Sequence, residues 1–173
     1  MKDNKEFDSA CGSCAYEART LPRWDELPDF GLYLDQVISL MERYLGQPVA
    51  PGERGLTTSM VNNYVKTGVV PPPQKKKYGR PHLACLIVVC ALKPVLPLEI
   101  IRQILAKRLA ENTLEETYDA FCEYFEEAER SALELIESLS KTSEPQNAIV
   151  VATLNAQAQR NVALAYFLQM DCE

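Results

Sequence analysis

The distribution of glycine constrains the fold of this chain more than any other feature of its sequence. All seven glycines lie before residue 80, and the 94 residues from 80 to 173 contain none. Because glycine marks turns and helix caps, its absence predicts that the second half consists of helices joined by a few short breaks. Strand signals are confined to residues 69–78, so we expect an all-α fold with at most one small β-hairpin.

Apolar periodicity predicts six helices. They cover residues 32–45, 57–67, 81–93, 98–109, 113–139 and 145–170. Thr57 or Thr58 is a good cap for the second helix, Gly68 ends it, and Thr113 opens a capping box at the start of the fifth. The third helix carries the apolar run 83–92 and is expected to form the centre of the core. The last two helices are expected to pair as an antiparallel hairpin.

These helices divide the chain into three regions. Residues 1–22 lack periodicity and are expected to form a flexible N-terminal arm. Residues 23–110 are expected to form a compact domain, and residues 111–173 an acidic helical hairpin. A chain of 173 residues can bury a core without disulfides, and its six cysteines are interpreted as thiols. The first residues lack the apolar stretch of a signal peptide, and the longest apolar run is about half a membrane span. We therefore expect a cytoplasmic protein that does not contact membranes.

Charge is segregated along the chain. The net charge of −6 would by itself argue against a nucleic-acid partner. Residues 1–53 carry a balance of −5 and residues 111–173 one of −10, whereas residues 54–110 hold ten basic residues against a single acid, a balance of +9. Screening over about 8 Å at physiological salt keeps the distant acidic segments from cancelling this field. The middle region is therefore expected to attract phosphate groups.

Residues 57–80 combine a polar helix with a basic turn. The helix offers hydroxyl groups and the amides of Asn62 and Asn63, and a rigid proline segment, 71–73, separates it from Lys75–Lys77. Asparagine can bind the edge of adenine, whereas hydroxyl groups and lysines bind phosphates. An isolated lysine triplet is most often a solvated turn, but its position beside this helix favours a nucleic-acid-binding surface.

The segment from Thr58 to Pro73, followed by Lys75–Arg80 and His82-Leu83, resembles the MerR-type winged helix-turn-helix, and the match continues into Leu98–Arg102. The family pattern Tyr-x-x-x-Gly-Leu-Leu-Pro, which ends the second helix of the motif, is matched by Tyr64, Gly68, Val69, Val70 and Pro71 or Pro72. The resemblance covers residues 56–109 and implies that 75–80 form a β-hairpin wing. Taken whole, the chain resembles a bacterial family, domain of unknown function 1836, whose fold is thought to be MerR-like.

The resemblance implies a bacterial transcriptional regulator that binds duplex DNA through residues 30–110. The family usually has Arg-Tyr at positions 62–63, so a different base specificity is expected here. We expect a homodimer that reads two half-sites, with the 111–173 hairpin providing the interface or an effector region. The sequence identifies no small-molecule effector. The expected DNA-binding residues are Thr58, Ser59, Asn62, Asn63 and Lys66 on the helix, and Lys75, Lys76, Lys77, Tyr78 and Arg80 in the wing.

Two other interpretations of the basic region remain open. The scaffold could serve as an all-α interaction module for an acidic protein, or the acidic C-terminal helices could cover the basic face and inhibit DNA binding until an effector releases them.

Catalytic and metal chemistry is not expected. The Cys11-Gly-Ser-Cys14 sequence has zinc-ligand spacing but no second pair, and His82, the only histidine, is interpreted as a helix-start or core residue. There is no phosphate-binding glycine loop and no Ser/His/Asp set. We therefore expect no enzyme activity, no cofactor and no metal site.

Overall fold

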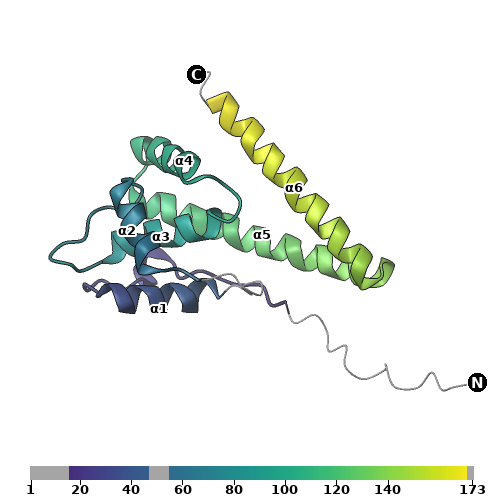
Figure 1. Ribbon diagram of the computed structural model, residues 1–173, viewed down its shortest axis with the longest axis horizontal. Coiled ribbons are helices and arrows are strands. Elements are labelled where there is room, and N and C mark those ends of the chain that lie inside the picture. Colours follow the sequence, from purple (N-terminus) through teal and green to yellow (C-terminus); the bar gives the residue numbers. More distant parts are fainter. Residues whose placement is uncertain (1–15, 47–54, 171–173) are drawn as a thin grey trace, which may run out of the picture.

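The computed structural model describes residues 16–46 and 55–170. Within these residues it contains a short 3-10 helix and six α-helices, and Figure 1 shows α1–α4 gathered at one end of α5. The elements are η1 (Trp24–Glu26), α1 (Leu34–Leu45), α2 (Thr58–Lys66), α3 (Arg80–Leu92), α4 (Leu98–Glu111), α5 (Leu114–Thr142) and α6 (Pro145–Met170). The predicted all-α class is confirmed, and the six helices begin and end within three residues of their predicted bounds.

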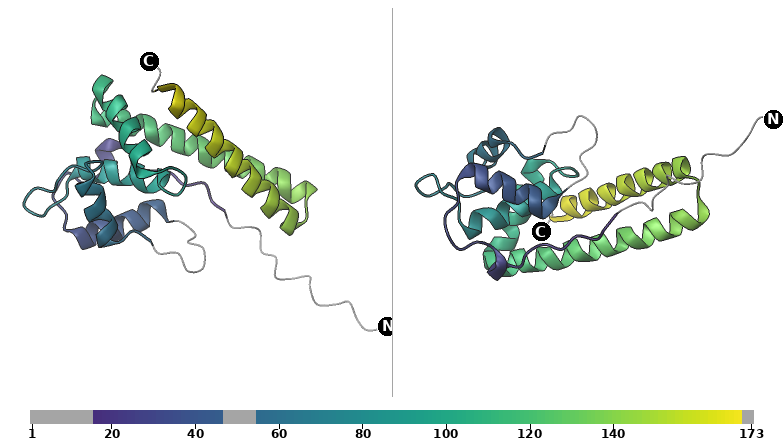
Figure 2. Two further views of the ribbon diagram at one scale, coloured as in Figure 1. Left: turned by 45° about the horizontal axis from the view of Figure 1, so that its top comes forward. Right: turned by 90° about the horizontal axis from the view of Figure 1, so that it is seen from below.

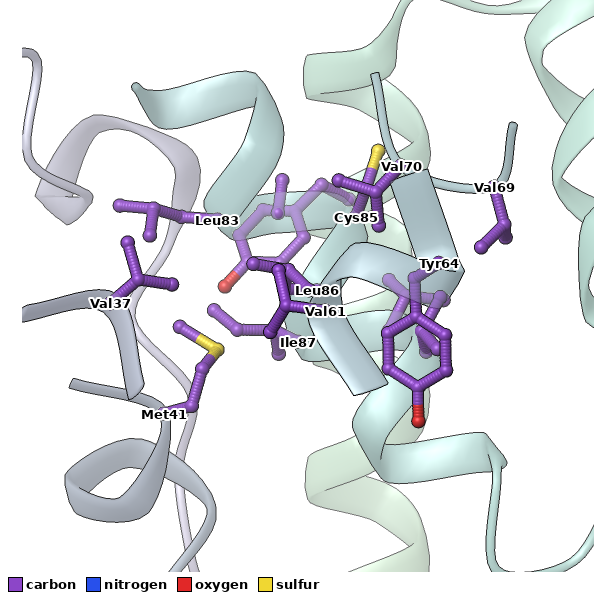
Figure 3. Packing of buried hydrophobic residues seen from close by; sticks show 14 of the residues in the cluster. Val37, Met41, Val61, Tyr64, Val69, Val70, Leu83, Cys85, Leu86 and Ile87 are labelled. Carbon is purple, nitrogen blue, oxygen red and sulfur yellow. The ribbon is translucent and has the colours of Figure 1, made fainter. Parts of the chain in front are cut away.

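Helix α3 lies at the centre of the core. Its residues 82–89 are all buried, and it contacts α1, α4 and α5. Figure 3 shows side chains of α1 and Val61 of α2 converging on Leu86 and Ile87. Each fully buried aliphatic side chain stabilises the fold by about 1.5–3 kcal/mol. Helix α3 is apolar on every side because neighbouring elements cover it on every side.

The predicted β-hairpin wing is wrong. The described residues contain no strand, and residues 74–78 form only two isolated bridges, Gln74 with Lys77 and Tyr78 with Leu32. The three prolines at 71–73 offer no N–H for a strand ladder, and α3 begins at Arg80, immediately after the turn. Tyr78 pairs with Leu32 instead, through hydrogen bonds of 2.8 and 2.9 Å, and this pairing ties the turn to the segment before α1.

Residues 16–22, which belong to the predicted flexible arm, lie against α5. The Arg19 guanidinium pairs with Glu129 at 2.6 Å, and the Tyr118 hydroxyl donates to the Pro22 carbonyl at 2.8 Å. Burial by itself would raise the pKa of Glu129, but hydrogen bonds from Arg19 and Tyr16 outweigh it and hold the pKa below its ordinary value. The first turns of α5 therefore belong to the same core as α1–α3, across the predicted domain boundary at residue 110.

Helices α5 and α6 form the predicted hairpin, and Figure 1 shows the two arms diverging from their connection. The acidic residues of the hairpin lie on α5 and in the turn, because residues 145–170 contain no Asp or Glu. Arg160 is the one charged residue of α6, and α6 contains no buried residue. No helix in the described ranges is both long enough and apolar enough to cross a membrane.

Candidate nucleic-acid interface

Helix α2 presents one polar face to solvent. Thr57 caps it, accepting a hydrogen bond from the Met60 amide at 3.3 Å, and Gly68 ends it with a φ of +77°. Val61 and Tyr64 anchor its other face in the core. The exposed face carries all five predicted residues of the helix, Thr58, Ser59, Asn62, Asn63 and Lys66.

The three lysines occupy a tight turn that projects from the α2 end of the molecule, visible as the loop at the left of both panels of Figure 2. Lys75 and Lys76 have φ values of 48° and 63°, and two hydrogen bonds of 2.9 and 3.0 Å join Gln74 to Lys77. Positive φ at both central residues is typical of a type I′ turn, which prefers Asn-Gly. All three lysine side chains are exposed, and the Lys77 ammonium lies 5.4 Å from the centre of the Tyr33 ring.

Tyr78 and Arg80, which the sequence also assigned to DNA contact, lie elsewhere. Tyr78 is 4% exposed and packs edge-on against the His82 ring. The Arg80 guanidinium donates to the Leu27 carbonyl at 3.1 Å and lies 5.8 Å from the centre of the Trp24 ring. These two residues fasten the turn and the start of α3 to the N-terminal segment, and they are not part of the exposed set.

His82 holds together the two ends of the loop that carries the lysines. Its Nδ1 atom accepts a hydrogen bond from the Gly79 amide at 3.0 Å, and its Nε2 atom lies 3.1 Å from the Pro72 carbonyl oxygen. Because a carbonyl only accepts and an amide N–H only donates, these partners require the tautomer with hydrogen on Nε2. His82 is therefore a positioning residue that closes the neck of the loop.

Sequence reasoning missed two residues that shape this surface. Tyr33 places an exposed ring beneath Lys77, and Gly31 leaves room for the Lys77 side chain, because a Cβ on Gly31 would lie 2.9 Å from the Lys77 Cβ. No local pattern around residues 31–33 indicates these contacts, since they depend on the pairing of Leu32 with Tyr78.

The described cysteines are buried or half-buried thiols with little reactivity. Burial raises the pKa of Cys85 to about 11 and that of Cys90 to about 12, so both are protonated at neutral pH. Cys11 and Cys14, the candidate zinc pair, lie outside the described residues. Within the described ranges no three His, Cys, Asp or Glu side chains cluster in a way that could hold a metal ion.

Comparison with protein families gives one match. A family model described as domain of unknown function (DUF1836) matches residues 22–123. The matched segment contains α1–α4 and the first turns of α5, which together form the core described above. No curated protein and no solved structure matched the chain.

Proposed function

The chain belongs to the family described as domain of unknown function (DUF1836), and we propose that it binds duplex DNA as a bacterial transcription regulator. In this proposal the exposed face of α2 enters the major groove, and the lysine turn contacts the adjacent phosphates. Helix α2 has nine residues. An α-helix is about 10–12 Å in diameter with its side chains, which fits a major groove about 12 Å wide. The MerR-type resemblance of residues 56–109 supports the same orientation.

The polar face of α2 has the composition of a base-reading surface. Asn62 and Asn63 are exposed at the middle of the helix, where they are proposed to bind base edges. Thr58, Ser59 and Lys66 flank them and are proposed to bind the backbone. The face contains no acid, so nothing on it repels phosphate.

The conformation of the lysine turn is the observation that carries the proposal. For residues other than glycine a left-handed backbone costs roughly 1–2 kcal/mol, and Lys75 and Lys76 both adopt it. A turn needed only for folding would be more stable with Asn and Gly at these positions. Two exposed lysines in this place therefore support a use for their charge, as expected for a phosphate contact.

The double variant Lys75→Asn/Lys76→Gly separates folding from binding. Glycine at position 76 adopts a positive φ without strain, and asparagine at position 75 adopts it more readily than lysine does. We therefore expect the free energy of unfolding to rise by about 1–2 kcal/mol. The double variant also removes two proposed phosphate contacts, so the slope of log affinity against log salt should become shallower by about 0.9 for each phosphate that is no longer neutralised. The measurement is DNA binding at several salt concentrations, with unfolding by denaturant in parallel.

The matched control is Arg130→Gln/Lys141→Gln, which removes two positive charges from exposed positions on α5. It should leave the salt slope of binding unchanged. An unchanged slope in the turn variant, or an equal change in both variants, would refute the role of the turn.

Asn62→Ala and Asn63→Ala test the base contacts. Removing either amide should reduce the preference for the selected DNA sequence by about 1–3 kcal/mol, with no change in the salt slope. The sequence itself is obtained by selecting bound duplexes from a random pool at near-physiological salt. Failure of the wild-type protein to enrich any sequence would contradict specific DNA binding and favour the alternative, an acidic protein partner for the same basic face.

The proposed autoinhibition by the acidic hairpin requires a narrower deletion than residues 112–173. That deletion would remove Tyr118 and Cys122, which are both fully buried in the core. Three acidic side chains of α5, those of Asp119, Glu126 and Glu129, bind the N-terminal segment, as in the pair of Arg23 with Glu126 at 2.9 Å. Deleting residues 143–173 keeps α5 with its acidic side chains. Tighter DNA binding by this shortened protein would support steric inhibition by α6 and not inhibition by the acidic charge of α5.

A further inference from the structure

Helix α6 exposes an apolar surface along most of its length. In the described chain it contacts α5, and Arg160 donates to the Val95 carbonyl at 3.0 Å, while Leu164 packs against the core. Apolar side chains nevertheless remain exposed on its other faces: Ile149, Val150, Val151, Leu154, Val162, Tyr166 and Leu168. A helix that is apolar on several faces is stable when several faces are covered.

Part of this surface is a regular seam, defined here as Val151, Leu154, Ala158, Asn161, Ala165 and Leu168. The steps between these residues are three, four, three, four and three, which is the repeat of helices that pair along their length. The seam spans about 26 Å and contains no charge. Arg160 and Leu164, which face the body of the protein, lie roughly a third of a turn away from its centre line.

We propose that α6 pairs antiparallel with α6 of a second copy of this chain, along the seam. A two-fold axis between Ala158 and Asn161 places Val151 opposite Leu168 of the second copy, and Leu154 opposite Ala165 of the second copy. The large Leu154 side chain thus meets a small one, as close packing requires. The seam is therefore complementary to itself in one register, which is the condition for a closed two-fold interface.

Asn161 suits the centre of such an interface. Its Oδ1 atom already accepts a hydrogen bond from Gln157 on the same helix at 3.1 Å. Burial against Ala158 of the second copy would therefore leave fewer unsatisfied polar groups. A single buried asparagine in an apolar seam also fixes the register of paired helices.

The chemistry of the surface disfavours other occupants. An interfacial membrane helix is rich in Lys and Arg on its polar face, whereas the only charge of α6 is Arg160, which faces the protein. Residues 1–15 of the chain carry five charged residues and a single large aromatic one, Phe7, so they do not match an uncharged seam. A second copy supplies an equally long, uncharged and apolar surface.

The inference rests on the proposed function and deepens it, because a dimer would bring two α2 helices to two half-sites on DNA. Its test uses the protein without DNA, so failure of dimerisation and failure of DNA binding are distinguished. Sedimentation velocity at micromolar concentration should give a dimer for the wild-type protein. A monomer at these concentrations would overturn the inference.

Leu154→Asp tests the seam. We expect self-association to weaken about 100-fold or more, because an apolar side chain is removed from both copies and a carboxylate would be buried in its place. The matched control is Ile149→Asp, which introduces the same charge at an exposed apolar position of α6 on the opposite side from the seam. Both side chains are exposed, so circular dichroism should show unchanged helix content. Equal association of the two variants would overturn the assignment.

Oxidative cross-linking tests the orientation. The double variant Ala158→Cys/Asn161→Cys should form a covalent dimer, because the thiol at position 158 of each copy faces the thiol at position 161 of the other copy. Neither single variant should cross-link more than the wild-type protein does. The wild-type protein is the control for cross-linking through the native cysteines. Cross-linking by either single variant would indicate a parallel arrangement and would contradict the proposed pairing.

Discussion

Replacing His82 tests whether this one side chain holds the lysine-bearing loop in place. His82→Phe keeps an aromatic ring beside Tyr78 but removes both hydrogen bonds, the one from the Gly79 amide and the one to the Pro72 carbonyl. Each such bond contributes about 1 kcal/mol net. We therefore expect the free energy of unfolding, measured by urea denaturation at pH 7, to fall by about 2 kcal/mol.

A second substitution at the same position makes the test graded. His82 is the third residue of α3, and a glutamine at this position of a helix can accept a hydrogen bond from the amide of the capping residue, here Gly79. His82→Gln should therefore reduce stability about half as much, by roughly 1 kcal/mol. Equal reductions in the two variants, or a reduction below about 0.5 kcal/mol for His82→Phe, would refute the reasoning.

The same variants report on the loop directly. If His82 closes the neck of the loop, its removal should speed tryptic cleavage after Lys75–Lys77 relative to cleavage after Lys141, which lies at the end of α5. A cleavage rate that follows global stability alone, with the same acceleration at both sites, would show that the histidine does not act locally on the loop.

Two further predictions concern α5. Because the pKa of Glu129 is lower in the folded protein than in the unfolded one, its contribution to stability is complete above its unfolded pKa and is lost as pH falls through its folded pKa. Wild-type unfolding free energy, measured between about pH 6 and pH 3, should therefore fall more steeply than that of Glu129→Gln; parallel curves would contradict this. The buried Thr117 hydroxyl has no hydrogen-bond partner among the described residues, so Thr117→Val should leave the melting temperature unchanged or raise it by a few degrees, and a clear decrease would show that the hydroxyl is satisfied.

Local sequence patterns predicted the helices and the centre of the core. Thr57 and Thr113 accept the expected capping hydrogen bonds, and the apolar run 83–92 lies at the centre of the core as expected. These predictions succeed because caps and helical faces depend on residues within a few positions of one another. The exposed face of α2 followed from the same local rule.

The wing, which was predicted wrongly, and the positions of Tyr78 and Arg80 depend on residues far apart in the sequence. The wing was expected from the MerR-type resemblance of residues 75–80, but Tyr78 pairs with Leu32, which lies far upstream, before α1. The guanidinium group of Arg80 is of a type that binds phosphate, yet it donates to the Leu27 carbonyl and packs against Trp24. No local pattern reports such partners, because the competing intramolecular sites appear only when the chain is folded.

The contacts between the N-terminal segment and α5 set an order for the assembly of the core during synthesis. Tyr118 binds Pro22 across 96 positions, and Arg19 binds Glu129 across 110. Helices α1–α3 leave the ribosome long before these partners, so one side of α3 stays uncovered until most of α5 has been made. The nascent chain thus carries an exposed apolar helix for much of its translation. A polypeptide that ends before residue 118 would keep this helix exposed and would be recognised by chaperones and proteases.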